Sequence, residues 1–399
     1  MADATCAGCG CVCDDIEVTV AEGRLAAVTR TCALGDAWFA ERSGDRPPVA
    51  RVDGRTVSVE EAVDAAAAIL RQARAPLVYG LGQTSCEAQR RAVALADAIG
   101  AVVDPAGGST AGEAYQAIGA STATFGEIRD RAELVVVWRA DPAVTHPRLL
   151  GRLRLDRAAR GSRALVVVDA RRTATAEQAD ALIELDPAHD FEALWSLRAL
   201  AGGSRLDREL PLEGLDGLVQ QLLAVRHVAL IHGALDELGA LALSSLVRDL
   251  SRDRHAVTLA LRGDGNARGA EDVLAWQTGF PAAVSFARGH PRAGPGEFSA
   301  TALLERGEVD AALVVASDPL EHLSPAAAAR LRELPAVVVD ARATATSQAA
   351  RVAFAAAADG IEVPGTIHRM DGVPVPLRAP LAAERPGVED VLAAIGGRL

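Results

Sequence analysis

The chain has 399 residues, of which 50% are hydrophobic and 3% aromatic, and its formal charge is −12. This length allows two or three domains with buried cores, so folding by itself requires neither disulfides nor a metal. An acidic chain without a clustered basic face is a poor candidate for binding nucleic acid or a membrane surface. Its apolar runs are shorter than a membrane span and no secretory signal is visible, so we expect a cytoplasmic location.

The N-terminal segment is rich in cysteine. Four cysteines fall within eight positions: Cys6, Cys9, Cys11 and Cys13. Residues 15–31 read as two short strands joined by a Glu22-Gly23 turn, and this hairpin brings Cys32 back toward the group. In the cytoplasm such thiols are metal ligands or buried side chains rather than disulfides. We therefore expect a small Cys-rich β domain over residues 1–50.

Four of these thiols are spaced as a [4Fe-4S] cluster requires, with one thiolate for each corner of the cube. The predicted metal ligands are Cys6, Cys9, Cys13 and Cys32. Spacing alone does not separate soft metals, so a tetrahedral zinc site and an empty reduced thiol patch stay open as alternatives. Cys11 is an additional thiol, and Cys86, inside a predicted helix, is interpreted as a small buried side chain.

After a proline-rich joint at 46–48, the sequence predicts a βα unit typical of Rossmann-like layers. Residues 58–73 begin with Ser58 and have helical apolar spacing. Residues 75–100 then predict a buried strand, a turn that contains Gly80 and Gly82, and a second helix.

An internal repeat links residues 132–180 with residues 311–350. In each copy an apolar strand ends in Asp-Pro, a helix follows, and a second strand ends in Asp-Ala-Arg. The Asp-Pro pairs begin at Asp141 and Asp318, and the Asp-Ala-Arg triplets at Asp169 and Asp340. Two copies predict two related Rossmann-like α/β domains, one at 51–105 with 305–399 and the other at 106–304.

Ligands of parallel sheets bind at the carboxyl ends of the strands, so these Asp and Arg residues are expected to line one shared cleft. The alternative is that each Asp merely ends its strand and each Arg pairs with a nearby carboxylate. For a single copy that alternative is favoured, whereas the duplication favours an inherited nucleotide cleft.

Six motifs in order resemble the B subunit of formylmethanofuran dehydrogenase, a member of the molybdopterin oxidoreductase superfamily. They are CAGCGCVCDDIEV, YGLGQTSCEAQ, VVVWRADPAVTHPRLLGR, VVVDARRTATAEQAD, WQTGFPAAVSFARGHPRAGPGEF and GIEVPGTIHRMDGVPV. The resemblance runs from Cys6 to Pro376 and implies a molybdopterin-oxidoreductase-like fold. It further implies a tungsten- or molybdenum-pterin enzyme that reduces CO2 to formate and is fed by an N-terminal [4Fe-4S] cluster.

Two departures from the family pattern indicate that the metal-pterin centre has been lost. The family's cysteine ligand is missing from residues 102–119, where Ser109 and Thr110 stand at the expected metal-ligand position. The family's Trp-Gly-x-Asn-Pro strand end has Arg139 in place of Gly and Asp141 in place of Asn. The larger side chain fills space, and the carboxylate adds charge beside cofactor phosphates, although an Arg could instead pair with a phosphate.

The resemblance is strongest to the B subunit of the bacterial formyltransferase/hydrolase complex of tetrahydromethanopterin-linked formaldehyde oxidation. It implies companion subunits that pass a formyl group to a methanofuran-like carrier and hydrolyse it to formate. This chain would be their structural partner, with a [4Fe-4S] cluster and no molybdopterin or tungstopterin. The alternatives are a catalytic tungsten- or molybdenum-pterin subunit of a formylmethanofuran dehydrogenase, and an orphan nucleotide-binding protein that uses the old cleft.

Several polar residues are candidates for cofactor or carrier contacts. They are Asp141, His146, Arg148, Asp169, Arg171, Arg288 and Arg369. His146 and Arg148 stand at a helix start, which can hold an anion but more often caps and packs the helix. Arg288 belongs to a loop rich in Gly and Pro, plausible as a cleft lid, as a carrier contact or as a rigid interface loop. Arg369 is part of the specific C-terminal motif.

Overall fold

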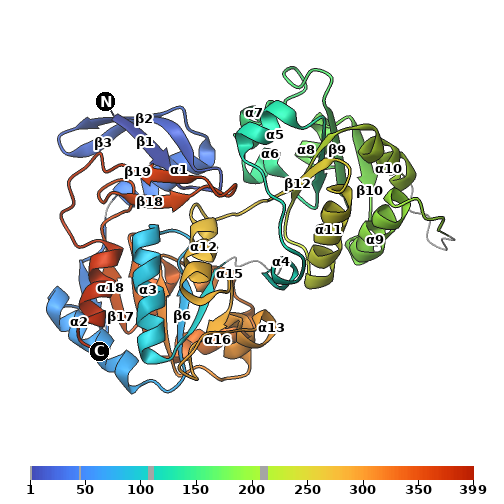
Figure 1. Ribbon diagram of the computed structural model, residues 1–399. Coiled ribbons are helices and arrows are strands. Elements are labelled where there is room, and N and C mark those ends of the chain that lie inside the picture. The colour runs from blue at the N-terminus through green and yellow to red at the C-terminus, as the bar shows by residue number, and fades with distance from the viewer. Residues whose placement is uncertain (1, 45, 107–111, 207–213) are drawn as a thin grey trace. The chain divides into compact units, whose positions relative to one another are not determined.

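The computed structural model describes residues 2–44, 46–106, 112–206 and 214–399. It divides into two compact units, each built around a largely parallel sheet (Figure 1). Unit 1 comprises Met1–Gly108 and Gly263–Leu399, and unit 2 comprises Ser109–Arg262. Ser109 and Thr110, the predicted metal-ligand position, lie outside the described residues.

Unit 1 begins with a three-stranded antiparallel sheet in the order β1-β2-β3. Its strands are β1 (Ala2–Cys6), β2 (Cys13–Ala21) and β3 (Arg24–Thr29), followed by helix α1 (Ala33–Ser43). The turn between β2 and β3 has Glu22 at φ 50° and Gly23 at φ 72°. Two left-handed residues in succession match the twist of a tight hairpin, so the hairpin predicted here is confirmed.

The main sheet of unit 1 has nine strands in the order β14-β13-β7-β6-β15-β16-β17-β4-β5. They are β4 (Ala50–Val52), β5 (Arg55–Thr56), β6 (Pro76–Gly80), β7 (Val102–Pro105), β13 (Val284–Ser285), β14 (Arg292–Ala293), β15 (Ala311–Val315), β16 (Ala336–Asp340) and β17 (Val352–Ala355). The central strands β7, β6, β15, β16 and β17 are parallel, while the outer strands pair antiparallel.

Helices cover both faces of this sheet, because its central strands are apolar on both sides. One core joins the sheet to α2 (Val59–Gln72), α3 (Cys86–Ile99), α12 (Ala267–Thr278) and α18 (Val388–Gly396). The other core includes α14 (Ala300–Glu305) and α16 (Pro325–Glu333). The remaining elements are α13 (Pro295–Phe298), α15 (Pro319–His322), α17 (Ala345–Ala349), and the hairpin of β18 (Gly365–His368) and β19 (Pro374–Leu377).

Unit 2 is a five-stranded parallel sheet in the order β10-β9-β8-β11-β12. Its strands are β8 (Leu134–Trp138), β9 (Ala164–Asp169), β10 (Ala181–Glu184), β11 (His227–His232) and β12 (His255–Ala260). Its helices are α4 (Gly112–Ile118), α5 (Phe125–Arg131), α6 (Pro142–Thr145), α7 (Leu149–Arg152), α8 (Ala174–Gln178), α9 (Asp190–Ala201), α10 (Leu215–Ala224), α11 (Glu237–Leu250) and the 3-10 turn Pro187–His189.

The boundary of the second α/β unit differs from the predicted one. Residues 263–304, expected to belong with 106–262, lie in unit 1. Val273 and Leu274 of α12 are buried in the core that α3 shares, and Val284 of β13 pairs with Val103 of β7. Because apolar surface goes where it can be buried, this segment completes the first sheet instead of extending the second.

No helix within the described ranges is long and apolar enough to cross a membrane.

Candidate functional site

The cysteine-rich loop of unit 1 connects β1 to β2. Cys6 and Cys13 lie opposite each other where these strands pair, and the backbone N–H of Val12 donates to the Cys9 carbonyl at 3.1 Å. Cys6, Cys9, Cys11 and Cys13 are all buried, and Cys32 at the start of α1 is half-buried. The hairpin therefore does return Cys32 toward the loop.

The electrostatics of Cys6 identify its neighbours. Burial, together with negative charge on Cys13, Cys9 and Cys32, raises the pKa of the Cys6 thiol to about 12. The Gly8 N–H, which donates to Cys6 Sγ at 3.4 Å, acts in the opposite direction. The three cysteines that act on Cys6 are those that the sequence groups with it, and Cys11 is not among them.

Two segments distant in sequence, the β18–β19 hairpin and the residues around Gly265, hold this loop and the end of β1 in place. The Met370 N–H donates to the Gly10 carbonyl at 3.0 Å, and Thr5 Oγ1 donates to the Pro376 carbonyl at 3.0 Å. A Cβ on Gly265 would lie 2.2 Å from the Ala7 carbonyl oxygen, so only glycine allows this approach. Tertiary contacts thus fix the backbone of the loop.

None of the six cysteines, all of which are described, forms a disulfide. In the described parts of the chain no group of three or more His, Cys, Asp or Glu side chains has the arrangement of a metal site. The assignment of a metal to Cys6, Cys9, Cys13 and Cys32 stays a prediction.

A buried cation, Arg42, lies between this loop and the carboxyl edge of the main sheet. Its guanidinium donates to the Trp38 carbonyl at 3.2 Å and to Gln83 Oε1 at 3.1 Å. Burial and the charge of Arg342 lower the pKa of Arg42 to about 10, while negative charges on Asp340, Glu41 and Cys6 oppose that shift. The sequence analysis missed Arg42.

The signal for Arg42 was present in the sequence. Gly35, Trp38, Phe39 and Arg42 form the buried face of α1, and they recur at helical spacing. An arginine in an otherwise apolar stripe indicates a buried charge with a specific partner.

Polar side chains gather where β6 and β16 of unit 1 end. Asp340 ends β16 and binds the guanidinium of Arg342 at 3.2 Å. Gln83 follows the glycine turn after β6 and donates to Asp264 Oδ1 at 2.7 Å. A Cβ on Gly82 would lie 2.4 Å from the other oxygen of Asp264, so this glycine has a packing role.

The Asp-Pro pairs of the internal repeat have the same structural role in both units. Asp141 accepts from the Thr175 N–H at 2.9 Å and from the Thr175 hydroxyl at 2.6 Å. Asp318 accepts from the Thr346 N–H at 3.0 Å and also from the Thr346 hydroxyl. Each carboxylate fixes the helix that follows the second strand, so the structure gives Asp141 a partner within its own unit.

Arg139 also has its ion-pair partner within unit 2, although its buried NH2 group has no hydrogen-bond partner among the described residues. Its Nε lies 3.0 Å from both carboxylate oxygens of Asp190, and its NH1 donates to the Leu185 carbonyl at 2.7 Å. Trp138 Nε1 donates to the same carboxylate at 3.0 Å. Arg139 has φ 51°, a left-handed conformation that glycine adopts more easily. The departure from the family pattern at 139 is therefore compensated by a carboxylate of the same unit.

The other candidates of unit 2 fall into two groups. His146 is buried and internal: its Nε2 lies 2.8 Å from the Arg262 carbonyl oxygen and its Nδ1 lies 2.9 Å from Thr145 Oγ1. Burial lowers its pKa, although the bond to Arg262 opposes the shift. Arg148 and Asp169 are half-buried, and Arg171 is exposed.

The two candidates in unit 1 lie apart in the fold. Arg288 is exposed in the loop between β13 and β14. Arg369 lies in the turn between β18 and β19, where its guanidinium binds Asp371 at 2.7 and 2.8 Å. The N–H of the next residue, Met370, donates to the Gly10 carbonyl, so Arg369 lies beside the cysteine-rich loop.

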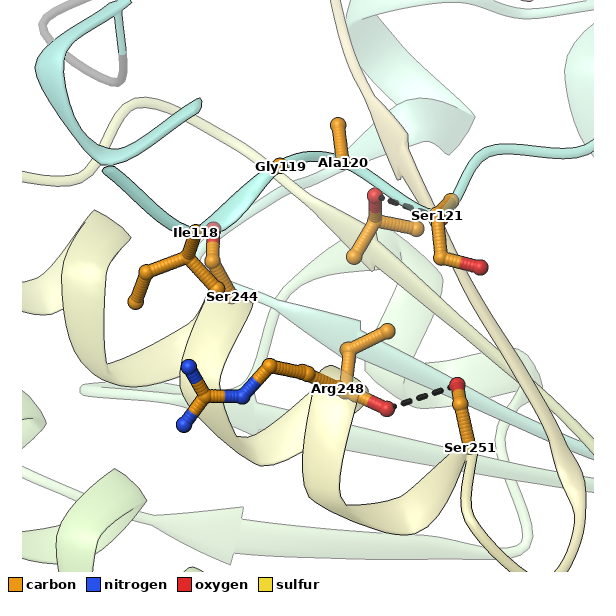
Figure 2. Close-up of a pocket in the computed structure, with 9 residues that line it drawn as sticks. Ile118, Gly119, Ala120, Ser121, Ser244, Arg248 and Ser251 are labelled. Atoms are coloured by element: carbon orange, nitrogen blue, oxygen red, sulfur yellow. Dashed lines mark hydrogen bonds between the residues drawn. The ribbon is translucent and has the colours of Figure 1, made fainter. Parts of the chain in front are cut away.

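Unit 2 also has a pocket of about 250 Å³ that the sequence did not indicate. Figure 2 shows it between α11 and the segment that follows α4, lined in part by Ser121, Ser244, Arg248 and Ser251. The Thr258 hydroxyl donates to the Ser121 carbonyl at 3.2 Å, and the Ser251 hydroxyl to the Val247 carbonyl at 2.8 Å. These hydroxyls stabilise the local backbone.

No protein-family model matches the chain. It is 33% identical to the B subunit of the tungsten-containing formylmethanofuran dehydrogenase 2 of Methanocaldococcus jannaschii, over 94% of this chain and 92% of that protein. The chain belongs to the family of formylmethanofuran dehydrogenase B subunits. The resemblance inferred from the sequence motifs is thereby confirmed.

Two further similarities lie in the same family. The chain is 31% identical to the B subunit of the formyltransferase/hydrolase complex Fhc of Methylorubrum extorquens, over 67% of this chain and 74% of that protein. It also resembles a chain in the crystal structure of the FhcABCD complex of M. extorquens with methylofuran. The TM-score is 0.72 and the identity 28%, and the match covers 88% of this chain and 98% of that chain.

The Gly265 contact leads to a first prediction about this family member. Gly265→Ala pushes a Cβ into the Ala7 backbone, so the cysteine-rich loop must shift, at a cost of about 1–3 kcal/mol in the free energy of unfolding. We expect more thiols of the native variant to react with a thiol reagent. Gly263→Ala is the control, because nothing lies within 4 Å of a Cβ there. Equal thiol reactivity in both variants would contradict the assigned packing.

The Asp141 contacts lead to a second prediction. Asp141→Ala leaves the donors of Thr175 without their carboxylate and should lower the free energy of unfolding by about 3 kcal/mol, measured by urea denaturation. Asp169→Ala, which removes an acceptor only for the adjacent Ala170 N–H, should cost less than about 1 kcal/mol. If Asp141→Ala were as stable as the wild type, its carboxylate would serve a ligand and not the fold.

Proposed function

We propose that this chain is the B subunit of a formyltransferase/hydrolase complex of one-carbon metabolism. It would serve as a structural, cluster-containing partner of the subunits that transfer and hydrolyse the formyl group on a methanofuran-like carrier. The similarity that carries this proposal is the match over 98% of a chain in the FhcABCD complex. In this proposal the fold is of the molybdopterin-oxidoreductase type, with its pterin cleft vacated.

The Arg139 contacts support a vacated cleft. An Arg at this position could have served to bind a cofactor phosphate, since guanidinium pairs well with phosphate. Here its side chain is only 9% exposed and is bound to the carboxylate of Asp190. Its charge is therefore already compensated, and the space beside the strand end is filled by protein atoms.

The cysteine-rich loop supports a bound iron-sulfur cluster. Three buried thiols and the half-buried thiol of Cys32 match in number and kind the donor set that a [4Fe-4S] cluster takes. A buried thiol with a raised pKa is protonated near neutral pH, so binding of a cluster or of zinc must displace protons from it. The buried charge of Arg42 next to Cys6 would offset negative charge on the thiolates.

A second candidate function is a catalytic metal-pterin subunit of a formylmethanofuran dehydrogenase. It is favoured by the identity of 33% to the tungsten-containing relative, over 94% of this chain. In that case Ser109, Thr110 or no protein side chain would bind the metal.

Metal analysis separates these candidates. We expect about four Fe per chain and neither Mo nor W when the complex is purified without oxygen from its native host and analysed by mass spectrometry. Stoichiometric W or Mo would overturn the structural role and favour the catalytic one. One Zn without Fe would retain the structural role but replace the cluster by a zinc site.

Variants of single cysteines test the ligand set. Cys13→Ser should remove most of the iron from the purified complex, because a cluster that loses one thiolate is held weakly. Cys11→Ser is the matched control, since Cys11 is buried in the same loop but is not among the predicted ligands. Equal iron content in the two variants would show that the predicted ligand set is wrong.

A further inference from the structure

Helix α12 presents one large apolar side chain to solvent. Trp276 is 63% exposed, whereas Ala270, Val273 and Leu274 of the same helix are buried in the core of unit 1. The side of the helix that faces the core is therefore packed without the Trp276 indole. Tryptophan exposed to this degree is enriched among residues that anchor protein–protein interfaces.

The indole is held by an ordered polar network. The rings of Trp276 and His368 meet edge to face, with centroids 5.4 Å apart. The His368 ring nitrogen Nδ1 lies 2.7 Å from Asp272 Oδ2, and Arg268 pairs with Asp272 at 3.1 Å. Arg268, Asp272 and Trp276 recur every four residues and so share one face of α12. A side chain ordered in advance loses little entropy when a partner binds.

A polar hollow of about 280 Å³ lies between α3, α12 and α18, and Gln277, the neighbour of Trp276 in the chain, is part of its lining. Its carboxylates are engaged: Glu87 accepts from the Thr366 N–H at 2.9 Å, and Glu389 pairs with Arg91 at 3.3 Å. Arg90 also lines the hollow, and no carboxylate within the described ranges forms an ion pair with it. The lining has two guanidinium and two carboxylate groups, and Arg90 is the guanidinium that no carboxylate of the lining pairs with.

We propose that Trp276 and Arg90 form a docking site for a companion subunit. The segment that docks lays an apolar side chain on the indole and points an Asp or Glu carboxylate into the hollow toward Arg90. This inference rests on the proposed function, which supplies the companion subunits. A second copy of this chain fits less well, because a symmetric contact would bring together two faces whose carboxylates are already paired.

The test measures assembly of the full chain with its companion subunits. Trp276→Ala and Arg90→Ala are each co-expressed with those subunits, and Kd is measured after purification. We expect Kd to rise about tenfold or more for Trp276→Ala, and by a smaller factor that shrinks with added salt for Arg90→Ala. The controls are Leu238→Ala, 54% exposed on α11, and Arg330→Ala, which removes a surface ion pair with Glu333 on the opposite face of the sheet.

A spectroscopic measurement makes the test independent of any loss of folding. The chain has four Trp residues, of which Trp38 and Trp138 are buried and Trp195 is partly buried. With 5-fluorotryptophan in this chain alone, the 19F resonance of Trp276, assigned with Trp276→Phe, should lose its sensitivity to solvent when the companion subunits are added. A resonance that stays solvent-sensitive in the assembled complex would overturn the proposal.

The outcomes separate this proposal from the proposed function. If the wild-type chain assembles and both test variants bind like the controls, the docking site is wrong while the proposed function stands. If the wild-type chain binds none of the companion subunits, the proposed function fails and the docking site with it. If Trp276→Ala changes only self-association of the isolated chain, the face is a contact between copies and the proposal is overturned.

Discussion

The burial of a group of thiols next to a buried arginine is the constraint on which unit 1 depends. A thiolate in a medium of low polarity is costly, and for this reason the pKa of Cys6 is raised to about 12. Burial also disfavours the charged form of Arg42, and for this reason the pKa of its guanidinium is lowered to about 10. Negative charge on Cys6 and on Asp340 at the end of β16 favours the charged form of Arg42, so these groups are electrostatically linked through α1.

This link explains why distant segments meet at the cysteine-rich loop. The loop has to be closed by backbone groups, and the chain supplies them from Gly265 and from the turn at Met370. Residues 263–304, which lie in unit 1 because their apolar side chains are buried there, also supply a contact to the loop through Gly265. Unit 2 is built on a single five-stranded sheet.

The internal repeat shows how inherited geometry and present use have separated. Asp141 and Asp318 keep the same bonds to Thr175 and Thr346, so the repeat persists as a structural device in both units. The side chain of Arg139 pairs within its own unit. For a single copy the sequence favoured a structural role for the Asp, and the contacts of Asp141 agree with that role. The sequence left open whether Arg139 fills space at the strand end or pairs with a phosphate.

The sequence by itself determined the family, the hairpin that returns Cys32, the parallel sheets and the burial of Cys86, because these follow from motif order, turn residues and the spacing of apolar side chains. The tertiary structure alone decided the place of residues 263–304 and the partners of Arg42 and Arg139. These contacts depend on which segments distant in sequence pack together, and local patterns of residues do not determine such packing.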